Sequence, residues 1–249
     1  MGNEKFIKRI VEIMMLTLAT FNIASGRIPD TERMNQLFNK HQIDIIGLQE
    51  VDCQTKRNAR DLVKELAGEE YRYQLFSKAM PFESGNYGNA LLSKYPVINY
   101  KEIGFLSSGE EPRAAQFVQI RLGNNQVITI CNTHLSFESI EIRQEQSEEI
   151  LQNMKVIGGE NQVIMGDFNM DQSEEEWELL KKDYQLANGQ RNLWLQTFRE
   201  PDENMKRASI DNILVSNTIE LVETTMIETQ LSDHNLLKVK IKIDEGDTR

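Results

Sequence analysis

Short apolar runs alternate with amphipathic segments along nearly the whole chain. Apolar or alternating runs predict strands over residues 16–21, 43–48, 90–92, 117–121, 127–132, 163–165, 213–215 and 237–243. Apolar residues at helical spacing predict helices after Asp30, over 62–67 and over about 138–157, and Gly68 and Gly158 are typical helix terminators. The order of elements therefore interleaves strands and helices.

A further helix is predicted to contain Trp177 and Leu180, because Ser173 and Glu176 have the spacing of a capping box before them. The sequence contains no linker rich in Pro, Gly or Ser and no internal repeat. Interleaved strands and helices without such a break predict a single domain of the α/β or α+β class over residues 14–249.

Polar residues gather abruptly where predicted strands end or begin. Clusters of this kind contain Asn22, Glu50, His134, Asp167, Asn169, Asp211, Asp233 and His234. Strand ends are rigid, so a sheet can present side chains from several of them to one crevice. If these ends converge, they form a site of carboxylate, amide and imidazole groups without thiolates.

Oxygen donors of this kind favour a hard cation, Mg²⁺ or Mn²⁺, over zinc. A hard cation in turn favours phosphate oxygens as substrate ligands. Each residue alone is weak evidence, since Asn22 by itself is typical of a turn and His41, which has no acidic company, is assigned to structure. The joint occurrence is informative, because two of the three histidines lie in these clusters.

Composition narrows the class of protein. The 249 residues are 39% hydrophobic and 27% charged, which is enough to bury a sizeable core and excludes disorder as the main state. With 28 basic and 39 acidic side chains, the net charge is −11. Bulk charge of this sign repels phosphate backbones, so a nucleic-acid scaffold is excluded, whereas an enzyme that meets phosphates through a cation is not.

Cys53 and Cys131 lie far apart in the sequence and neither has a CxxC partner. This spacing favours the interpretation that both are small buried hydrophobic side chains, and a reducing compartment suits them. Residues 1–13 are predicted to be a loosely ordered leader, and Met14 or Met15 is an alternative start. No apolar run approaches the ~20 residues that span a bilayer. We expect a cytoplasmic protein, with a signal peptide and secretion as the alternative.

Seven strings carry a resemblance to a known family, in that family's order from residue 20 onward: Thr20-Phe21-Asn22-Ile23, Leu48-Gln49-Glu50-Val51-Asp52, residues 87–96 (YGNALLSKYP), Asn132-Thr133-His134-Leu135, Gly166-Asp167-Phe168-Asn169, Ile210-Asp211-Asn212 and Ser232-Asp233-His234. In this combination the chain resembles the endonuclease/exonuclease/phosphatase (DNase I-like) superfamily. The resemblance implies an α+β fold, a four-layer α/β/β/α sandwich of two mixed sheets packed face to face. It also implies a phosphoester hydrolase that depends on Mg²⁺ or Mn²⁺.

By the resemblance, the metal site consists of Glu50 as principal ligand, Asn22 beside it, and Asp233 completing or supporting it. Asp167 resembles the group that orients or deprotonates the attacking water. Asn169 resembles the neighbour that holds the phosphate or that water.

The resemblance gives the two histidines separate roles. His134 is similar to a residue that contacts the phosphoryl group, and His234, held by Asp211, to one that stabilises the transition state or acts as general acid or base. Tyr87 and Arg113 are expected to contact substrate, and aromatic packing is the alternative for Tyr87. Which histidine or aspartate moves which proton stays open, as does the choice between one and two metal ions.

The sequence leaves open which phosphoester is the substrate. The sequence has no basic cluster for gripping duplex DNA, no apolar hairpin for a lipid surface, and an acidic rather than lysine-rich segment after Asn169. Lys94 is either a substrate contact or an exposed surface charge. The chain looks most like small uncharacterised bacterial members of the superfamily. We expect a monomer that hydrolyses small or single-stranded phosphoesters, without strong duplex binding or stable membrane association.

Two other function classes stay open. The first is a non-catalytic module on the same fold that binds a phosphate ligand or a protein, although the intact Glu50, Asp167, His134 and His234 argue against it. The second is a lipid or protein interaction domain that uses the apolar stretch at residues 14–18.

Overall fold

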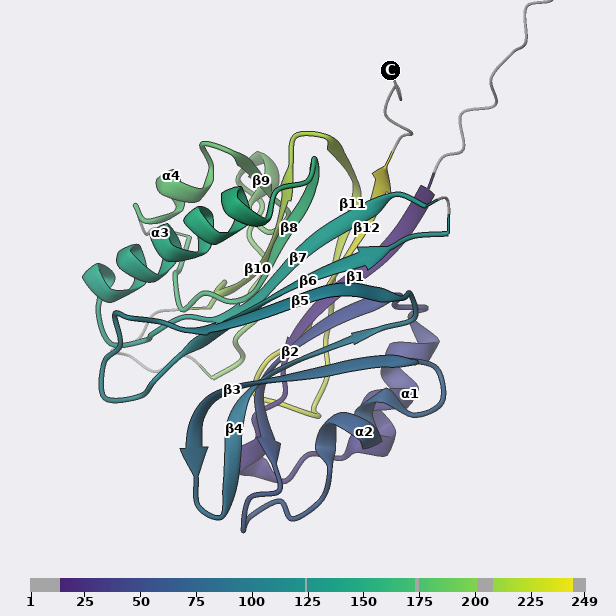
Figure 1. The fold of residues 1–249 in the computed structure, drawn as a ribbon, viewed down its shortest axis with the longest axis vertical. Helices are drawn as coiled ribbons and strands as arrows, with labels where there is room; N and C mark the ends of the chain where they lie inside the picture. The colour runs from purple at the N-terminus through teal and green to yellow at the C-terminus, as the bar shows by residue number, and fades with distance from the viewer. Residues whose placement is uncertain (1–13, 124, 173–174, 201–207, 244–249) are drawn as a thin grey trace, which may run out of the picture.

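The computed structural model describes residues 14–123, 125–172, 175–200 and 208–243. The leader predicted at residues 1–13 lies outside them. Two six-stranded sheets face each other in the orders β11-β12-β1-β2-β4-β3 and β5-β6-β7-β8-β10-β9, which we name sheet A and sheet B (Figure 1). Sheet A consists of β1 (Met14–Asn22), β2 (Ile45–Cys53), β3 (Tyr73–Phe82), β4 (Gly85–Ser93), β11 (Ile219–Ile227) and β12 (Leu236–Ile243).

Sheet B consists of β5 (Val97–Gly104), β6 (Ala114–Arg121), β7 (Val127–His134), β8 (Asn161–Asp167), β9 (Tyr184–Leu186) and β10 (Asp211–Ser216). The helices are α1 (Thr31–Lys40), α2 (Leu62–Ala67), α3 (Ile140–Ile157) and α4 (Trp177–Leu180), with short 3₁₀ turns η1 (Ser25–Arg27) and η2 (Gln190–Asn192). Both sheets are mixed, and the expected DNase I-like sandwich is confirmed.

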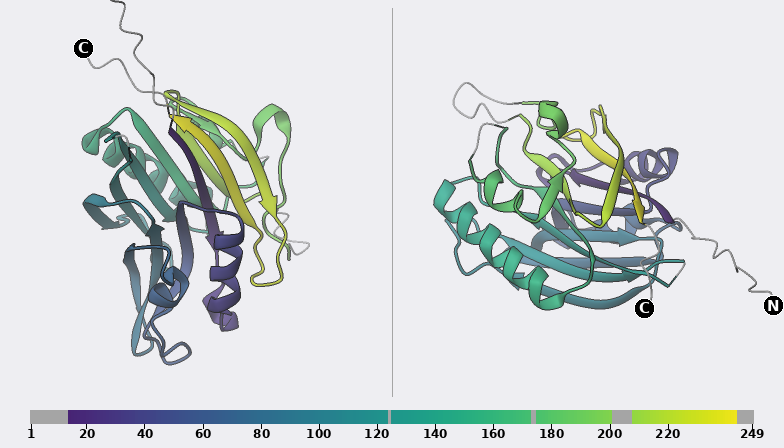
Figure 2. Two further views of the ribbon diagram at one scale, coloured as in Figure 1. Left: turned by 90° about the vertical axis from the view of Figure 1, so that its right-hand side faces the viewer. Right: turned by 90° about the horizontal axis from the view of Figure 1, so that it is seen from above.

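The helices cover the outer faces of the sheets. Met34 and Phe38 of α1 pack on sheet A, and Ile150 and Met154 of α3, with Trp177 of α4, pack on sheet B. Figure 2 shows the purple α1 and the teal-green α3 on opposite sides of the molecule. Between the sheets lies a third apolar cluster that includes Leu18, Ile128, Met165 and Val239. Four layers result because each sheet has two apolar faces to bury.

Side-chain caps begin three of the helices. The side chains of Asp30, Asp61 and Ser139 accept hydrogen bonds from backbone N–H groups three residues further on, at the N-termini of α1, α2 and α3. The helix predicted near Trp177 is confirmed over Trp177–Leu180, and Ser173 of its capping box lies outside the described residues. Within the described residues no helix combines the length and apolar character that a membrane span needs.

Each sheet has one parallel pair of strands, and this feature positions the site. In sheet A, β1 and β2 are parallel and α1 connects them; in sheet B, β7 and β8 are parallel and α3 connects them. The carboxyl ends of parallel strands meet at one edge of a sheet, so each pair brings two polar strand ends together. The pairs Asn22↔Gln49 and His134↔Asp167 mark these ends.

Candidate active site

The polar ends of the two parallel pairs meet between the sheets. Nδ2 of Asn22, at the end of β1, donates to Oε1 of Glu50 at 3.1 Å and to Oδ2 of Asp167 at 3.0 Å. Asn22 and Glu50 belong to sheet A, and Asp167 belongs to sheet B. One amide therefore joins carboxylates from both sheets, and the predicted convergence of strand ends occurs.

Glu50 lies on a bulge. The β2–β4 ladder pairs Leu48 with Ala90 and then Val51 with Gly88, so two residues of β2 stand against one of β4. Glu50 has a φ of 55°, a left-handed conformation that few residues other than glycine adopt. Burial raises the pKa of Glu50, the hydrogen bond from Asn22 and the charges of His234 and Arg113 lower it, and Asp233 raises it.

Asp167 is a buried carboxylate with few donors. Besides the bond from Asn22, its Oδ1 accepts one from the backbone N–H of Asn169 at 3.0 Å. Burial and the neighbouring charge of Asp211 raise the pKa of Asp167 to about 7, against the lowering effects of His234 and of these hydrogen bonds. A base whose pKa lies near neutrality is suited to proton transfer at neutral pH.

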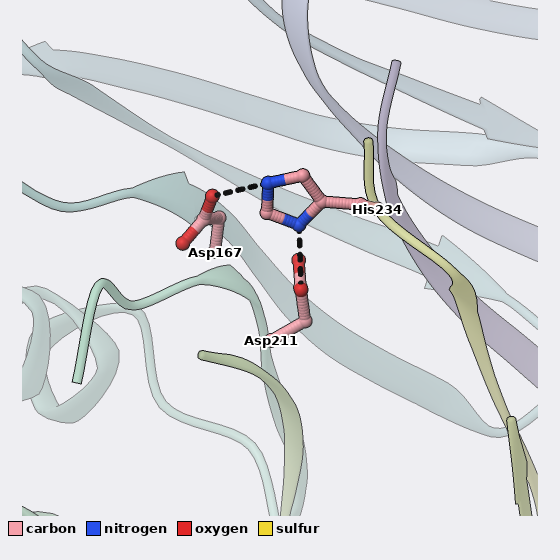
Figure 3. Close-up of side chains that lie close together, drawn as sticks. All are labelled: Asp167, Asp211 and His234. Carbon is pink, nitrogen blue, oxygen red and sulfur yellow. Dashed lines mark hydrogen bonds and ion pairs between the residues drawn. The ribbon is translucent and has the colours of Figure 1, made fainter. Parts of the chain in front are cut away.

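His234 lies between two aspartates, as Figure 3 shows. Its Nδ1 is 2.8 Å from Oδ2 of Asp211, and its Nε2 is 3.7 Å from Oδ2 of Asp167. Burial lowers the pKa of His234, but the charge and hydrogen bond of Asp211, followed by Asp167 and Asp233, raise it to about 10. The imidazole is therefore cationic at neutral pH, with Nδ1 bonded to Asp211 and Nε2 directed at Asp167.

His134 has the opposite electrostatics. Its Nδ1 is 3.2 Å from a guanidinium nitrogen of Arg113, and its Nε2 is 3.1 Å from Nδ2 of Asn169 and 3.5 Å from Oδ2 of Asp167. Burial, then the positive charges of Arg113 and His234, holds the pKa of His134 well below its usual range. Arginine has only donors, so the Nδ1 atom that faces it must accept. His134 is therefore a neutral imidazole.

Asp233 forms the outer edge of the cluster. Its Oδ2 is 3.1 Å from a guanidinium nitrogen of Arg27 in η1, and Arg27 also makes two hydrogen bonds to Glu200, at 3.0 and 2.8 Å. The hydroxyl of Ser232 donates to the carbonyl oxygen of Asn22 at 2.7 Å, which ties the loop before β12 to the end of β1. Asp233 is thus held beside the predicted metal ligands.

Tyr87 and Arg113 lie close enough to Glu50 to interact with its charge. Burial raises the pKa of Tyr87 well above its ordinary value, and the charge of Glu50 raises it further while Arg113 lowers it, so the hydroxyl keeps its proton. The ring also lies 6.1 Å from Phe82, centroid to centroid, so Tyr87 makes the aromatic packing contact of the alternative, and its role as a substrate contact stays a prediction. Arg113 is 5% exposed and pairs with Glu111 at 2.7 Å.

Lys94 is not part of this cluster. Its ammonium group lies 3.9 Å from Asp44 and 5.7 Å from the ring centroid of Tyr71, just outside the first residue of β2. Glu50 is near the other end of the same strand. Lys94 therefore lies away from the cluster as a half-buried partner of Asp44, and its role as a substrate contact stays a prediction.

The donor set fits a hard cation. Carboxylate oxygens of Glu50 and Asp233 lie at the cluster, and Oδ1 of Asp211 is buried and accepts no hydrogen bond among the described residues. Carboxylate oxygens of Asp167 and Asp211 lie within 4.8 Å of each other and of a ring nitrogen of His234, but the cationic imidazole donates from both nitrogens and leaves the ligand role to the carboxylates. Asn22 directs Nδ2 into the site and Oδ1 to the N–H of Ala24, an arrangement that orders the carboxylates. Oxygen-rich sites of this type suit Mg²⁺ or Mn²⁺.

Sequence reasoning missed two residues of the site. Arg27 lies five positions after Asn22, and this proximity to a predicted strand end is the signal that could have found it. Phe198 has a ring centroid 5.0 Å from that of His234 and forms an isolated bridge with it, in a segment without a periodic pattern. Only the folded chain brings Phe198 to the imidazole.

Comparison with known proteins supplies the family. The sequence model of the Endonuclease/Exonuclease/phosphatase family matches residues 19–234, a range that contains every predicted site residue. This chain belongs to the Endonuclease/Exonuclease/phosphatase family. No curated protein matches it in sequence.

Solved structures extend the family assignment to the fold. A family member from Bacteroides vulgatus has a TM-score of 0.76 at 20% identity, over 92% of this chain and 99% of that one. A mannosyl-6-phosphatase from Bacteroides thetaiotaomicron has a TM-score of 0.69 at 18% identity, over 91% and 99%. The human Nocturnin catalytic domain with bound sulfate has a TM-score of 0.72 at 18% identity, over 93% and 97%.

Proposed function

We propose that this protein is a hydrolase of phosphoric esters that uses water as nucleophile and depends on Mg²⁺ or Mn²⁺. The observation that carries the proposal is the meeting of Glu50, Asp167, the Asp211–His234 pair and His134 around the Asn22 amide. Family membership supports the same reaction class. The protein is proposed to act as a monomer in the cytoplasm.

The side chains divide the chemistry between them. Asp167, with its pKa near neutrality, orients the attacking water and accepts a proton from it. The cationic His234 directs Nε2–H at a phosphoryl oxygen or at the leaving oxygen, and Asp211 holds its ring in place. Neutral His134, Asn169 and Arg113 are placed to hold the remaining phosphoryl oxygens.

Glu50 and Asp233, with Asn22 and Asp211 in support, would hold the cation. When bound there, Mg²⁺ or Mn²⁺ supplies positive charge to phosphoryl oxygens, whose negative charge grows as the ester bond breaks. Asn22 orders the carboxylates before a cation binds, because its Nδ2 bonds both Glu50 and Asp167.

Small or single-stranded substrates are the proposed class. The arginines at the site are each paired with carboxylates, Arg27 with Glu200 and Asp233, Arg57 with Asp52, and Arg113 with Glu111. Paired cations and a net charge of −11 leave little attraction for the regularly spaced phosphates of a duplex. A mannosyl-6-phosphatase with the same fold provides a precedent for a small phosphoester.

A substrate panel with defined metals tests the proposal. The panel contains bis-p-nitrophenyl phosphate, p-nitrophenyl phosphate, sugar phosphates, mononucleotides, single-stranded DNA and duplex DNA, each with Mg²⁺, Mn²⁺ or EDTA. We expect EDTA-sensitive turnover, faster on the small and single-stranded members than on the duplex. No EDTA-sensitive turnover on any member would reject the hydrolase and favour the binding module.

Two matched variants connect turnover to the site. Glu50→Gln removes the charge of the principal predicted ligand, and Lys94→Gln removes a charge on the same sheet away from the cluster. We expect the half-saturating metal concentration to rise about tenfold or more in Glu50→Gln, since second-shell and ligand changes have effects of ~10–100-fold. Lys94→Gln should retain the wild-type titration. Equal titrations of Glu50→Gln and wild type would contradict the ligand role.

A further inference from the structure

A network of buried polar side chains joins the two sheets directly behind the site. Nε2 of Gln49, on β2, donates to Oδ1 of Asn132, on β7, at 2.7 Å and to Oγ1 of Thr20, on β1, at 3.0 Å. Nδ2 of Asn132 donates to Oε1 of Gln116, on β6, at 2.8 Å. All four side chains are buried, with 0% exposure, so bulk water does not compete for their hydrogen-bonding groups.

Asn132 also contacts the backbone at the bulge that carries Glu50. Its Nδ2 is 2.8 Å from the carbonyl oxygen of Ala90 and 3.3 Å from that of Leu48. Leu48 and Ala90 are the last residue pair of the β2–β4 ladder before the register shifts. A side chain from sheet B therefore fixes the position at which sheet A departs from regular pairing.

Three of the four members of the network lie one or two residues before a site residue on the same strand. Thr20 precedes Asn22 on β1, Gln49 precedes Glu50 on β2, and Asn132 precedes His134 on β7. A displacement of Asn132 relative to Gln49 would accordingly change the separation of Glu50 from His134, since strands transmit displacement over such short distances with little flexing.

Gly47 provides the space that the network occupies. A Cβ atom on Gly47 would lie 2.5 Å from Oδ1 and 2.8 Å from Cγ of Asn132, with Sδ of Met165 at 3.2 Å. No φ between +20° and +160° requires glycine here, so close approach of Asn132 is what this position accommodates. Alanine at position 47 would push the amide without removing any hydrogen-bonding group.

We propose that this amide network, Thr20, Gln49, Gln116 and Asn132, is a positioning element that sets the distance between the half of the active site on sheet A and the half on sheet B. The network touches neither substrate nor metal and acts through the bulge at Glu50 and the end of β7. The kinetic part of the inference rests on the proposed hydrolase function, whereas the structural part does not.

Histidine NMR spectroscopy tests the structural part without any turnover. The chain has three histidines, two in the site and His41 after α1, so His41 is an internal reference. Asn132→Leu should shift the ring signals of His134 and His234 and leave that of His41 unchanged. Gly47→Ala should do the same by crowding, and Thr20→Val, which removes only the hydrogen bonds between Thr20 and Gln49, should give smaller shifts at the same two signals.

Ile128→Ala is the matched control. Ile128 lies in the inter-sheet cluster at the other end of β7, so alanine there lowers the melting temperature without touching the network. We expect Ile128→Ala to leave all three histidine signals at their wild-type positions. If Asn132→Leu and Gly47→Ala also leave the site signals unshifted, or shift His41 equally, the positioning role is wrong. Should Asn132→Leu not fold, Gly47→Ala and Thr20→Val decide.

Kinetics test the second part, at temperatures well below each melting transition. Asn132→Leu and Gly47→Ala should lower kcat by about 10²-fold with little change in KM, as displacement of reacting groups by about 1 Å does. Ile128→Ala should keep wild-type kcat. Wild-type kcat in the shifted variants would overturn the positioning role, whereas an inactive wild type would reject the proposed function and leave the NMR result to decide the structural claim.

Discussion

Asp52 and Asp167 are both buried carboxylates, yet their surroundings differ. Asp52 accepts hydrogen bonds from Thr55, from two nitrogens of Arg57 and from Asn58, at 2.7–3.1 Å. Asp167 accepts bonds from two amides, faces Asp211, and has its pKa raised to about 7 by burial and by that neighbour. Residues of one local loop supply Asp52 with four hydrogen bonds, whereas Asp167, at a strand end, accepts only two.

The difference in partners indicates that Asp52 contributes to the stability of the fold and Asp167 to the chemistry of the site. A buried carboxylate whose oxygens are bonded to an arginine and to other donors of the same loop holds that loop in place. A buried carboxylate with few hydrogen-bond donors and a second carboxylate beside it can exchange a proton near neutral pH, or accept a metal cation. Burial alone therefore does not identify a functional aspartate; the number and charge of its partners do.

The largest expected effect is on turnover in Asp167→Ala. Loss of the group that handles the water proton should lower kcat by about 10²–10⁴-fold, measured on the best substrate of the panel at saturating metal. The fold should persist, because the alanine removes an under-satisfied charge. Near-wild-type turnover would remove Asp167 from the site.

The same variant has an expected pH signature in EDTA. The raised pKa means that the folded protein binds a proton that the unfolded chain releases between pH 3.8 and about 7. This contribution to stability is therefore lost as the pH rises through that window. In Asp167→Ala the decline of unfolding free energy across the window should be shallower than in wild type.

Asp52→Ala should have the opposite effects to Asp167→Ala, with a large loss of stability and a small loss of turnover. Removal of the carboxylate leaves Arg57 and Asn58 without their acceptor, so the free energy of unfolding should fall by about 3 kcal/mol. Chemical denaturation measures this change. We expect kcat of the folded variant to fall far less than in Asp167→Ala, and an unchanged unfolding free energy would refute the satisfied-loop interpretation.

The smallest expected effect is a shift in the pH dependence of turnover in Asp211→Asn, which changes the charge beside His234. Asp211→Asn removes the charge that opposes the pKa-lowering effect of burial, so the pKa of His234 should fall from about 10. Since cationic His234 is the active form, the alkaline decline in kcat should move to lower pH by about one to three units. A pH–rate profile from pH 5 to 11 measures the shift; superimposable alkaline limbs would argue against His234 as the cationic group.

The sequence predicted the central strands and missed the edges. The strands absent from the prediction are β3, β5, β9 and β11, which are the outermost strands of the two sheets. The central β4 and β7 are nearly continuously buried, whereas β5 alternates between half-buried and exposed residues without a regular period of two. Apolar runs report burial on both faces, so they detect strands with neighbours on both sides better than edges.

The site was predictable where strands end and unpredictable where loops fold back. Asn22, Glu50, His134 and Asp167 follow apolar runs, and this shared position, together with their residue types and the family resemblance, marked them. The bulge at Glu50 left no signal, because a bulge depends on pairing with β4 rather than on the local sequence. Long-range contacts such as Phe198 with His234 depend on tertiary packing that periodicity does not encode.

The pairing of β1 with β12 has a consequence for synthesis of the protein. β1 lies between β2 and β12, so sheet A cannot close around its first strand until residues 236–243 have left the ribosome. His234 and Asp233 also emerge only then, more than 200 positions after Asn22. Because domains fold as units and distant pairings form slowly, nascent chains should hold an open sheet edge and no assembled candidate site until residues 233–243 have been synthesised.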